Sequence, residues 1–148
     1  AASAAAASGV FSLTRRGSTR ALTFVTAQGC GNGQNDIDWS AIAGAQTTLA
    51  IYMGRAAAPH IAEQLITNGL RPSTPILIAV NVSSPHERLI RGRLDSLAVL
   101  MAAVGDRDPA LLLVGDVTHA NAETAGLSSE WLDLQTDIAP TPKVRIRA

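Results

Sequence analysis

The chain has 148 residues, 47% of them apolar and only 3% aromatic, and its formal net charge is zero. This length fits one domain with a largely aliphatic core, and the charge balance gives no basic excess for a nucleic-acid partner. No apolar run approaches the roughly 20 residues that span a bilayer, so we expect no membrane partner. The single cysteine, Cys30, cannot form an intrachain disulfide, which favours a reducing, cytoplasmic location.

The first part of the chain predicts a helix, a strand and a short helical turn. Residues 1–8 are all alanine or serine, good helix material, and Gly9 is placed to end the helix. Residues 22–27 predict a short strand, which leads into a glycine-rich loop. Asp38 is a candidate N-cap for one or two helical turns.

The middle of the chain predicts two buried strands around a helix. Residues 47–53 form a nearly continuous apolar run, typical of a strand that is covered on both faces. An apolar face at helical spacing follows, with Pro59 in its first turn and Gly69 at its end. Residues 75–81 predict a second buried strand, and the more polar residues 87–94 an edge strand.

The last part predicts one more helix and one more strand. Asp95 is expected to cap a helix that Gly105 closes, and residues 110–117 predict a third apolar strand. The pattern fades after Thr118. We therefore expect residues 1–119 to form the domain and residues 120–148 to form an extension or tail.

This alternation of strands and helices predicts an α/β fold, with a mixed, largely apolar central sheet and helices packed on it. In open α/β sheets, ligands bind beyond the carboxyl ends of the strands. Three segments occupy such positions: residues 52–54, 81–83 and 115–116. We expect Gly54 to let the chain turn sharply where a ligand approaches.

Local motifs are few, and each has a structural alternative. The GCGNG segment resembles a phosphate cradle, but a flexible loop is favoured because no helix opens directly after it. The three histidines have no metal-ligand spacing, so no metal is expected. Met53 suits either a flat ligand or core filling. Arg16, beside Arg15, suits either an anionic ligand or a solvated pair of arginines.

Longer segments carry a resemblance to a known family. In chain order they are AASAAAASGVFSLTRRG, ALTFVTAQG, DIDW, YMG, NGLRPSTPILIAV, ERLIRGRL and DPALLLVGDVT. Their order and spacing, over about residues 1–119, resemble the C-terminal half of the uroporphyrinogen-III C-methyltransferases, a branch of the tetrapyrrole methylase superfamily.

The resemblance implies an activity. Members of this branch use S-adenosylmethionine to methylate uroporphyrinogen III, giving precorrin-2 on the way to sirohaem and cobalamin, and they commonly form homodimers. Their glycine-rich cofactor loop and proposed acid–base groups lie in the N-terminal half. The resemblance therefore implies that this chain alone is inactive, and the catalytic residues stay unknown.

The resemblance also implies site residues. The methionine of YMG lines the cofactor site, which gives that role to Met53. The family's Thr-Ala-Ala segment matches Ala1 and Ala2, and its Glu-Asn-Gly-Thr loop matches residues 81–84, where Val82 replaces a glycine. The expected cofactor-binding set, for S-adenosylmethionine or S-adenosylhomocysteine, is Ala1, Ala2, Tyr52, Met53, Gly54, Val82 and Gly115. Arg16 matches an arginine in a region that faces the acidic tetrapyrrole.

Two other functions stay open from the sequence. One is a degenerate, non-enzymatic methylase-like domain that dimerises or binds a partner, since several segments depart from the family pattern. The other is a sister methylase that acts on a later corrinoid intermediate, although the YMG and ERLIRGRL segments favour the first branch.

Overall fold

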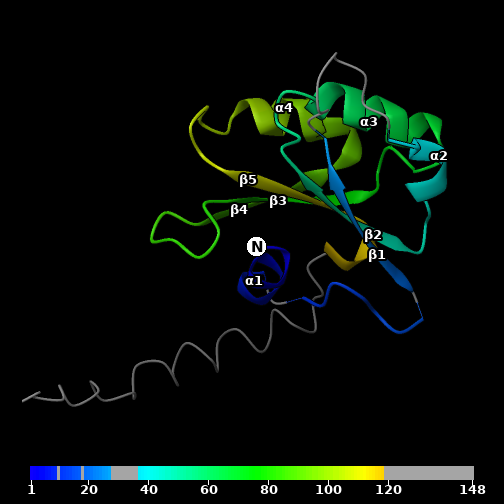
Figure 1. Cartoon of the computed structure of the whole chain (residues 1–148), viewed down its shortest axis with the longest axis horizontal. Coiled ribbons are helices and arrows are strands. Elements are labelled where there is room, and N and C mark those ends of the chain that lie inside the picture. Colours follow the sequence, from blue (N-terminus) through cyan, green and yellow to red (C-terminus); the bar gives the residue numbers. More distant parts are fainter. Residues whose placement is uncertain (10, 18, 28–36, 119–148) are drawn as a thin grey trace, which may run out of the picture.

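The computed structural model describes residues 1–9, 11–17, 19–27 and 37–118, and these form a five-stranded mixed sheet with helices on both faces (Figure 1). The elements are α1 (Ala2–Ser8), β1 (Ala21–Thr26), α2 (Trp39–Ile42), β2 (Thr47–Tyr52), α3 (Ala58–Thr67), β3 (Pro75–Val80), β4 (Arg88–Arg93), the 3₁₀ turn η1 (Leu94–Ser96), α4 (Leu97–Ala102), β5 (Ala110–Val114) and the 3₁₀ turn η2 (Asp116–Thr118). The predicted α/β fold with a mixed sheet is confirmed.

Strand direction decides which chain segments can meet. The strand order is β1-β2-β5-β3-β4. β1 pairs in parallel with β2, whereas β5 runs antiparallel to both β2 and β3, and β4 runs antiparallel to β3. Consequently β1, β2 and β3 all finish at the same end of the sheet, which we call the carboxyl end. β4 and β5 finish at the opposite end, which we call the amino end.

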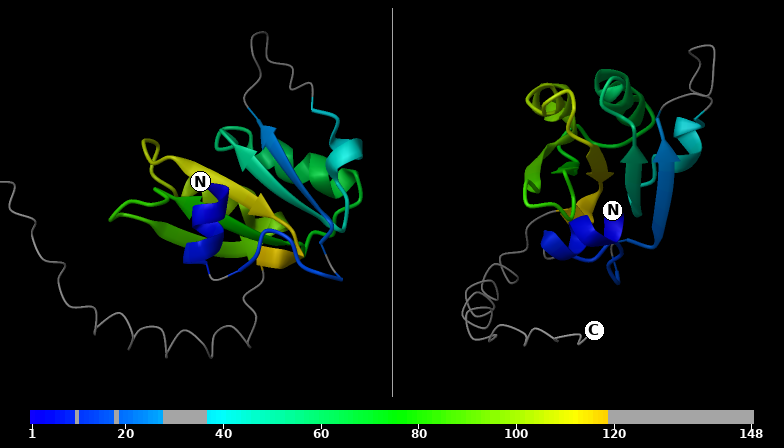
Figure 2. Two further views of the ribbon diagram at one scale, coloured as in Figure 1. Left: turned by 60° about the horizontal axis from the view of Figure 1, so that its bottom comes forward. Right: turned by 60° about the vertical axis from the view of Figure 1, so that its left-hand side comes forward.

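Both faces of the sheet are covered, as the apolar runs predicted. Because side chains alternate along a strand, Leu49 and Ile51 face the layer of α2, α3 and α4, while Ala50 faces α1. Figure 2 shows α1 on the side of the sheet opposite α3 and α4. Burying a leucine or isoleucine side chain stabilises the fold by roughly 1.5–3 kcal/mol, so these two layers supply most of the driving force.

Helix α1 covers its face with very small side chains. Ala2 and Ala5 are buried against Leu77, Ala79 and Leu111 of the sheet. Alanine has the highest helix propensity and no bulk beyond Cβ, so this helix both forms readily and packs closely.

Most element boundaries agree with the sequence predictions, with two corrections. Asp38 is the N-cap of α2, and its carboxylate accepts a hydrogen bond from the Ala41 N–H at 3.1 Å. Asp95, however, does not cap α4: it lies inside η1, where its carboxylate binds the Arg93 guanidinium, and Ser96 is the N-cap. The strand predicted over residues 110–117 ends at Val114, because the chain turns into η2 there.

Three features of the sequence analysis lie outside the described residues: the glycine-rich loop with Cys30, one of the three histidines (His119), and the tail over residues 120–148. Within the described part of the chain, no helix is long and apolar enough to cross a bilayer. The same part contains no group of three or more His, Cys, Asp or Glu residues that would hold a metal ion.

Candidate functional site

Among the residues that the structure describes, three other than glycine adopt a left-handed backbone, and all three lie at the carboxyl end of the sheet. Met53 has φ 53°, and Asn81 and Ser83 have φ 52° and 65°. Met53 directly follows β2, and the other two follow β3. Such a conformation costs a residue with a side chain about 1–3 kcal/mol, and residues of this kind cluster at ligand sites. The carboxyl end is therefore the candidate site.

Met53 also exposes its side chain. It is 56% exposed, although the strand that precedes it is almost fully buried. The alternative that Met53 fills the core is therefore wrong. An exposed, polarizable thioether held in a strained turn is available to pack on a ligand.

Gly54 has a different role from the one predicted. The tight turn belongs to Met53, since Gly54 has no left-handed φ. A Cβ at Gly54 would lie 3.0 Å from Cδ1 of Ile61 and 3.4 Å from Cγ2 of Ile51. Glycine is needed here so that α3 can pack against the end of β2.

The loop after β3 is held by side-chain hydrogen bonds. The Asn81 side-chain amide donates to Oδ1 of Asp108 at 3.0 Å, and the Asn81 N–H donates to the Pro109 carbonyl at 2.9 Å. The Ser83 N–H donates to Oε2 of Glu87 at 2.5 Å. Val82 lies between the two left-handed residues but is not left-handed itself. The valine that replaces a family glycine thus requires no strained backbone.

Glu87 connects this loop to α1. Hydrogen bonds from the Ser8 hydroxyl and from the Ser83 N–H lower the pKa of the Glu87 carboxyl group. Ser8 is the last residue of α1. The ionised carboxylate therefore links the end of α1 to the loop that follows β3.

The turn after β2 is held by Arg55. Its guanidinium donates to the Val104 carbonyl at 3.0 Å and also to the carbonyl groups of Gly105 and Asp108. These carbonyls follow α4 and precede β5. A guanidinium at the carboxyl terminus of a helix also complements the helix dipole.

The α1 face brings several predicted residues together. Tyr52 and Val82 both pack against the apolar cluster that contains Ala2. The rings of Tyr52 and Phe24 lie 6.4 Å apart, and Phe24 is 58% exposed on the edge strand β1. An apolar, partly aromatic surface therefore runs along this face to the turn at Met53.

Six predicted site residues lie at this end of the sheet or on the α1 face beside it. They are Ala1, Ala2, Tyr52, Met53, Gly54 and Val82.

Gly115 lies at the opposite end. It follows β5, which runs antiparallel to β2, so the carboxyl end of β5 is at the amino end of the sheet. Its φ is 138°, and a Cβ there would lie 3.0 Å from the Thr47 carbonyl oxygen. Six-residue strands span about 20 Å, so Gly115 does not share a site with Met53. Position 115 requires glycine because its backbone lies so close to the start of β2.

Arg16 also lies away from Met53. It is exposed in a turn whose ends, Arg15 and Thr19, form an isolated antiparallel bridge. The chain then joins β1 through a hydrogen bond of 2.8 Å from the Arg20 N–H to the Gln46 carbonyl. This junction is at the amino end of the sheet, so the structure does not bring Arg16 to the candidate site.

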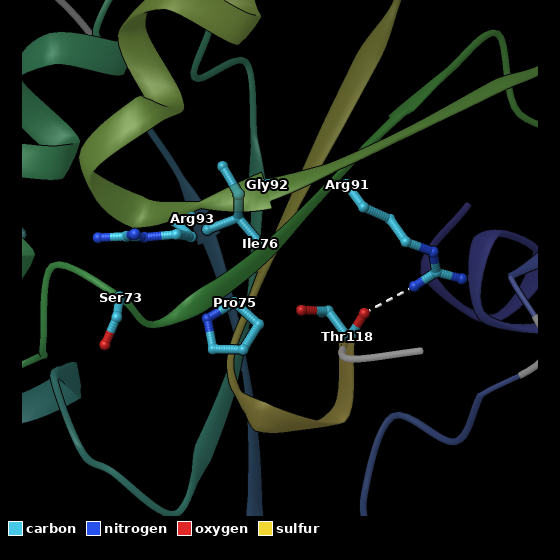
Figure 3. A pocket seen from close by; sticks show the side chains of 7 residues that line it. All are labelled: Ser73, Pro75, Ile76, Arg91, Gly92, Arg93 and Thr118. Atoms are coloured by element: carbon cyan, nitrogen blue, oxygen red, sulfur yellow. Dashed lines mark hydrogen bonds between the residues drawn. The ribbon is translucent and has the colours of Figure 1, made fainter. Parts of the chain in front are cut away.

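The amino end contains an open hollow of about 550 Å³ beside β3 and β4. Its lining residues are Ser73, Pro75, Ile76, Arg91, Gly92, Arg93 and Thr118 (Figure 3). Both arginines already have partners. Arg91 donates to the carbonyls of Thr118 at 2.6 Å and Gly9 at 2.8 Å, and Arg93 binds Asp95. The charged groups of the hollow therefore hold the fold together.

Sequence reasoning missed Arg55 and Asp108. Each makes a contact with a residue more than 25 positions away: Asp108 with Asn81, and Arg55 with Val104. No local pattern signals such pairs. The nearest available signal was Asn81 directly after a strand, because asparagine tolerates the left-handed conformation better than most residues.

A comparison with protein-family models identifies the family of the chain. The family model described as Tetrapyrrole (Corrin/Porphyrin) Methylases matches residues 1–98. The chain belongs to this family. The family in the resemblance drawn from the sequence segments is thereby confirmed.

Two similar relatives have names that belong to the synthesis of sirohaem or the methylation of uroporphyrinogen III. The chain is 38% identical over 130 residues to the uroporphyrinogen-III C-methyltransferase of Paracoccus denitrificans (strain Pd 1222), covering 88% of this chain and 45% of the relative. It is 41% identical over 117 residues to siroheme synthase 3 of Aeromonas hydrophila, covering 79% of this chain and 24% of the relative. The chain thus spans about half of the first relative and a quarter of the second. Its assignment to the C-terminal half stays a prediction.

Solved structures agree on the fold. A uroporphyrin-III C-methyltransferase from Thermus thermophilus, complexed with S-adenosylhomocysteine, has a TM-score of 0.65 and 30% identity, over 80% of this chain and 50% of that one. A cobalt-precorrin-4 methyltransferase has a TM-score of 0.70 over 79% of this chain and 49% of that one. Its identity is 22%, so it supports the fold alone.

Proposed function

We propose that this chain is the C-terminal half of an S-adenosylmethionine-dependent methyltransferase that converts uroporphyrinogen III to precorrin-2. The observation that carries the proposal is Met53, exposed and left-handed at the carboxyl end of the sheet. The relatives of the chain include a uroporphyrinogen-III C-methyltransferase, and one similar solved structure is complexed with S-adenosylhomocysteine. The product would feed the synthesis of sirohaem and cobalamin.

The residues at the carboxyl end fit an adenosyl cofactor. Tyr52 and Met53 offer apolar, polarizable surface that suits a flat base, and Tyr52 packs against the cluster that contains Ala2. When bound, the cofactor supplies an electrophilic methyl group on a sulfonium. The protein's contribution is then mainly to align the reactants and exclude water, which can provide much of the rate enhancement. This explains why the chain carries few polar groups of obvious catalytic type.

The remaining parts of the proposal concern the whole protein. The other half would supply the glycine-rich cofactor loop and the acid–base groups, and the isolated chain would be inactive. Residues 1–119 would form the family domain and residues 120–148 an extension. Arg16 would contact substrate carboxylates at a place separate from Met53. We also propose a cytoplasmic homodimer.

A methylation assay tests this function. The full-length protein and the 148-residue chain are each given uroporphyrinogen III and S-adenosylmethionine with a labelled methyl group. We expect label in precorrin-2 with the full-length protein and none with the chain alone. No transfer by the full-length protein would favour the degenerate, non-enzymatic alternative. Transfer only to a later corrinoid intermediate would favour a sister methylase.

One departure from the family pattern requires no unusual backbone. Val82 in place of a glycine suggested a degenerate cofactor loop. The left-handed positions of that loop are Asn81 and Ser83, so Val82 is compatible with an ordinary backbone there.

A further inference from the structure

We propose that Asp108 is a positioning residue that holds the two strained turns of the carboxyl end as one rigid wall. One turn follows β2 at Met53, and the other follows β3 at residues 81–83. The inference rests on the proposed function only in that this wall would face the cofactor.

The carboxylate of Asp108 holds the turn after β3. Its Oδ1 accepts a hydrogen bond from the Asn81 side-chain amide at 3.0 Å, and its Oδ2 accepts one from Nη2 of Arg88 at 3.2 Å. Each oxygen therefore has its own donor, one on each side of the loop that joins β3 to β4. The Asp108 side chain is 35% exposed, so solvent screens these bonds only in part.

The backbone of Asp108 holds the turn after β2. Its carbonyl accepts a hydrogen bond from Arg55, which lies two residues after Met53. Its N–H donates to the Gly105 carbonyl at 3.0 Å, and the same carbonyl also binds Arg55. Asp108, on the loop before β5, thus contacts both the segment that follows β2 and the segment that follows β3.

This arrangement explains how non-glycine residues keep a left-handed backbone. Strained conformations persist only where the surrounding contacts over-determine them. At Asn81 that contact is the side-chain bond to Asp108. The Met53 side chain has no hydrogen-bond donor, and Arg55, two residues later, ties its turn to the carbonyls of Val104 and Asp108.

The neighbouring acidic residue provides a matched control. Asp106 lies on the same loop, its side chain is fully exposed, and its only described ion pair is a contact of 4.0 Å to Arg55. Asp106→Ala therefore removes the same charge from the same loop without removing the bonds that fix Asn81. Asp108→Asn is the conservative variant, because its side-chain oxygen can still accept from Asn81, whereas its NH2 group cannot accept from Arg88.

The first experiment compares backbone amides in the 148-residue chain by heteronuclear NMR and hydrogen exchange. We expect Asp108→Ala to shift the amides of Asn81 and Ser83, and more weakly that of Gly54, and to speed exchange at Ser83 roughly tenfold. Asp108→Asn should fall between the wild type and Asp108→Ala. Amides unmoved by Asp108→Ala, or moved equally by Asp106→Ala, would overturn the proposal. If Asp108→Ala does not fold, the amide shifts of Asp108→Asn are compared with those of Asp106→Ala in the same way, and unmoved or equally moved amides would again overturn the proposal.

The second experiment measures S-adenosylhomocysteine affinity and melting temperature in the full-length protein. We expect Asp108→Ala to weaken binding about tenfold relative to Asp106→Ala, while Asp108→Asn recovers part of the loss. A lower melting temperature with unchanged affinity would reduce Asp108 to a structural residue and overturn its positioning role. If the wild type binds no S-adenosylhomocysteine but the amides move as expected, the proposed function fails and the link between the two turns stands.

Discussion

Met53 combines two features that a purely structural residue would avoid. Its backbone is left-handed, and its apolar side chain is 56% exposed. Glycine would remove the backbone strain, and a polar residue would remove the exposed apolar area. Retaining methionine makes physical sense if another molecule covers it, because the exposed thioether then gains contacts that offset the strain.

Substitutions at Gly115 and Gly69 can distinguish the cost of backbone strain from the cost of a steric contact. Both have positive φ, 138° and 109°, but a Cβ at Gly115 would lie 3.0 Å from the Thr47 carbonyl, whereas Gly69 has open space. We expect Gly115→Ala to lower the free energy of unfolding by at least about 1 kcal/mol more than Gly69→Ala does. Urea unfolding of the two variants measures this difference. Equal losses would mean that only the backbone angle matters at Gly115.

Among the elements, helix α2 is capped at its N-terminus by the ionised carboxylate of Asp38. The Ser40 hydroxyl and the Ala41 N–H lower the pKa of Asp38 below its ordinary value of 3.8. A lowered pKa means that the cap stabilises the fold above that value and that its contribution is lost as the pH falls through the lower, folded value.

Asp38→Ala should therefore shift the urea midpoint downward at pH 7, and the shift should shrink below about pH 4. Unfolding curves of the wild type and the variant at several pH values measure this. A shift that stays constant down to pH 2 would show that packing, and not charge, carries the effect.

Helix α1 is held to the sheet by small apolar contacts and by Arg91. This guanidinium donates to the carbonyls of Gly9 and Thr118 and lies 6.0 Å from the centre of the Phe11 ring. We expect Arg91→Met to cost about 1–3 kcal/mol and to speed hydrogen exchange in α1 before exchange in α3. Exchange that rises equally in both helices would mean that Arg91 supports the whole fold.

At the scale of the whole molecule, apolar runs predicted where the strands lie but not which way they point. Residues 47–53 and 110–117 have the same kind of pattern, yet β2 and β5 are antiparallel. Burial on both faces makes a strand apolar whatever its direction, so Gly115 was assigned to the wrong end of the sheet. The resemblance assigned Arg16 a role, but the structure was needed to show its distance from Met53.

The loop conformations were also beyond local reasoning. Chain position placed Met53 and Asn81 at strand ends, but their left-handed backbones depend on Arg55 and Asp108, which lie elsewhere in the chain. Contacts between distant loops follow from strand order, and that order appears only in the folded sheet.

The central claim is that the carboxyl end of the sheet, at Met53, forms part of the cofactor site. Its most direct test is a calorimetric titration of S-adenosylhomocysteine into the full-length protein and two variants, Met53→Lys and Val99→Lys. Val99 is 75% exposed on α4, so its variant makes the same kind of change in the helical layer on the other face. We predict that Met53→Lys weakens binding at least about tenfold while Val99→Lys leaves it unchanged. Equal affinity in all three proteins would contradict the account.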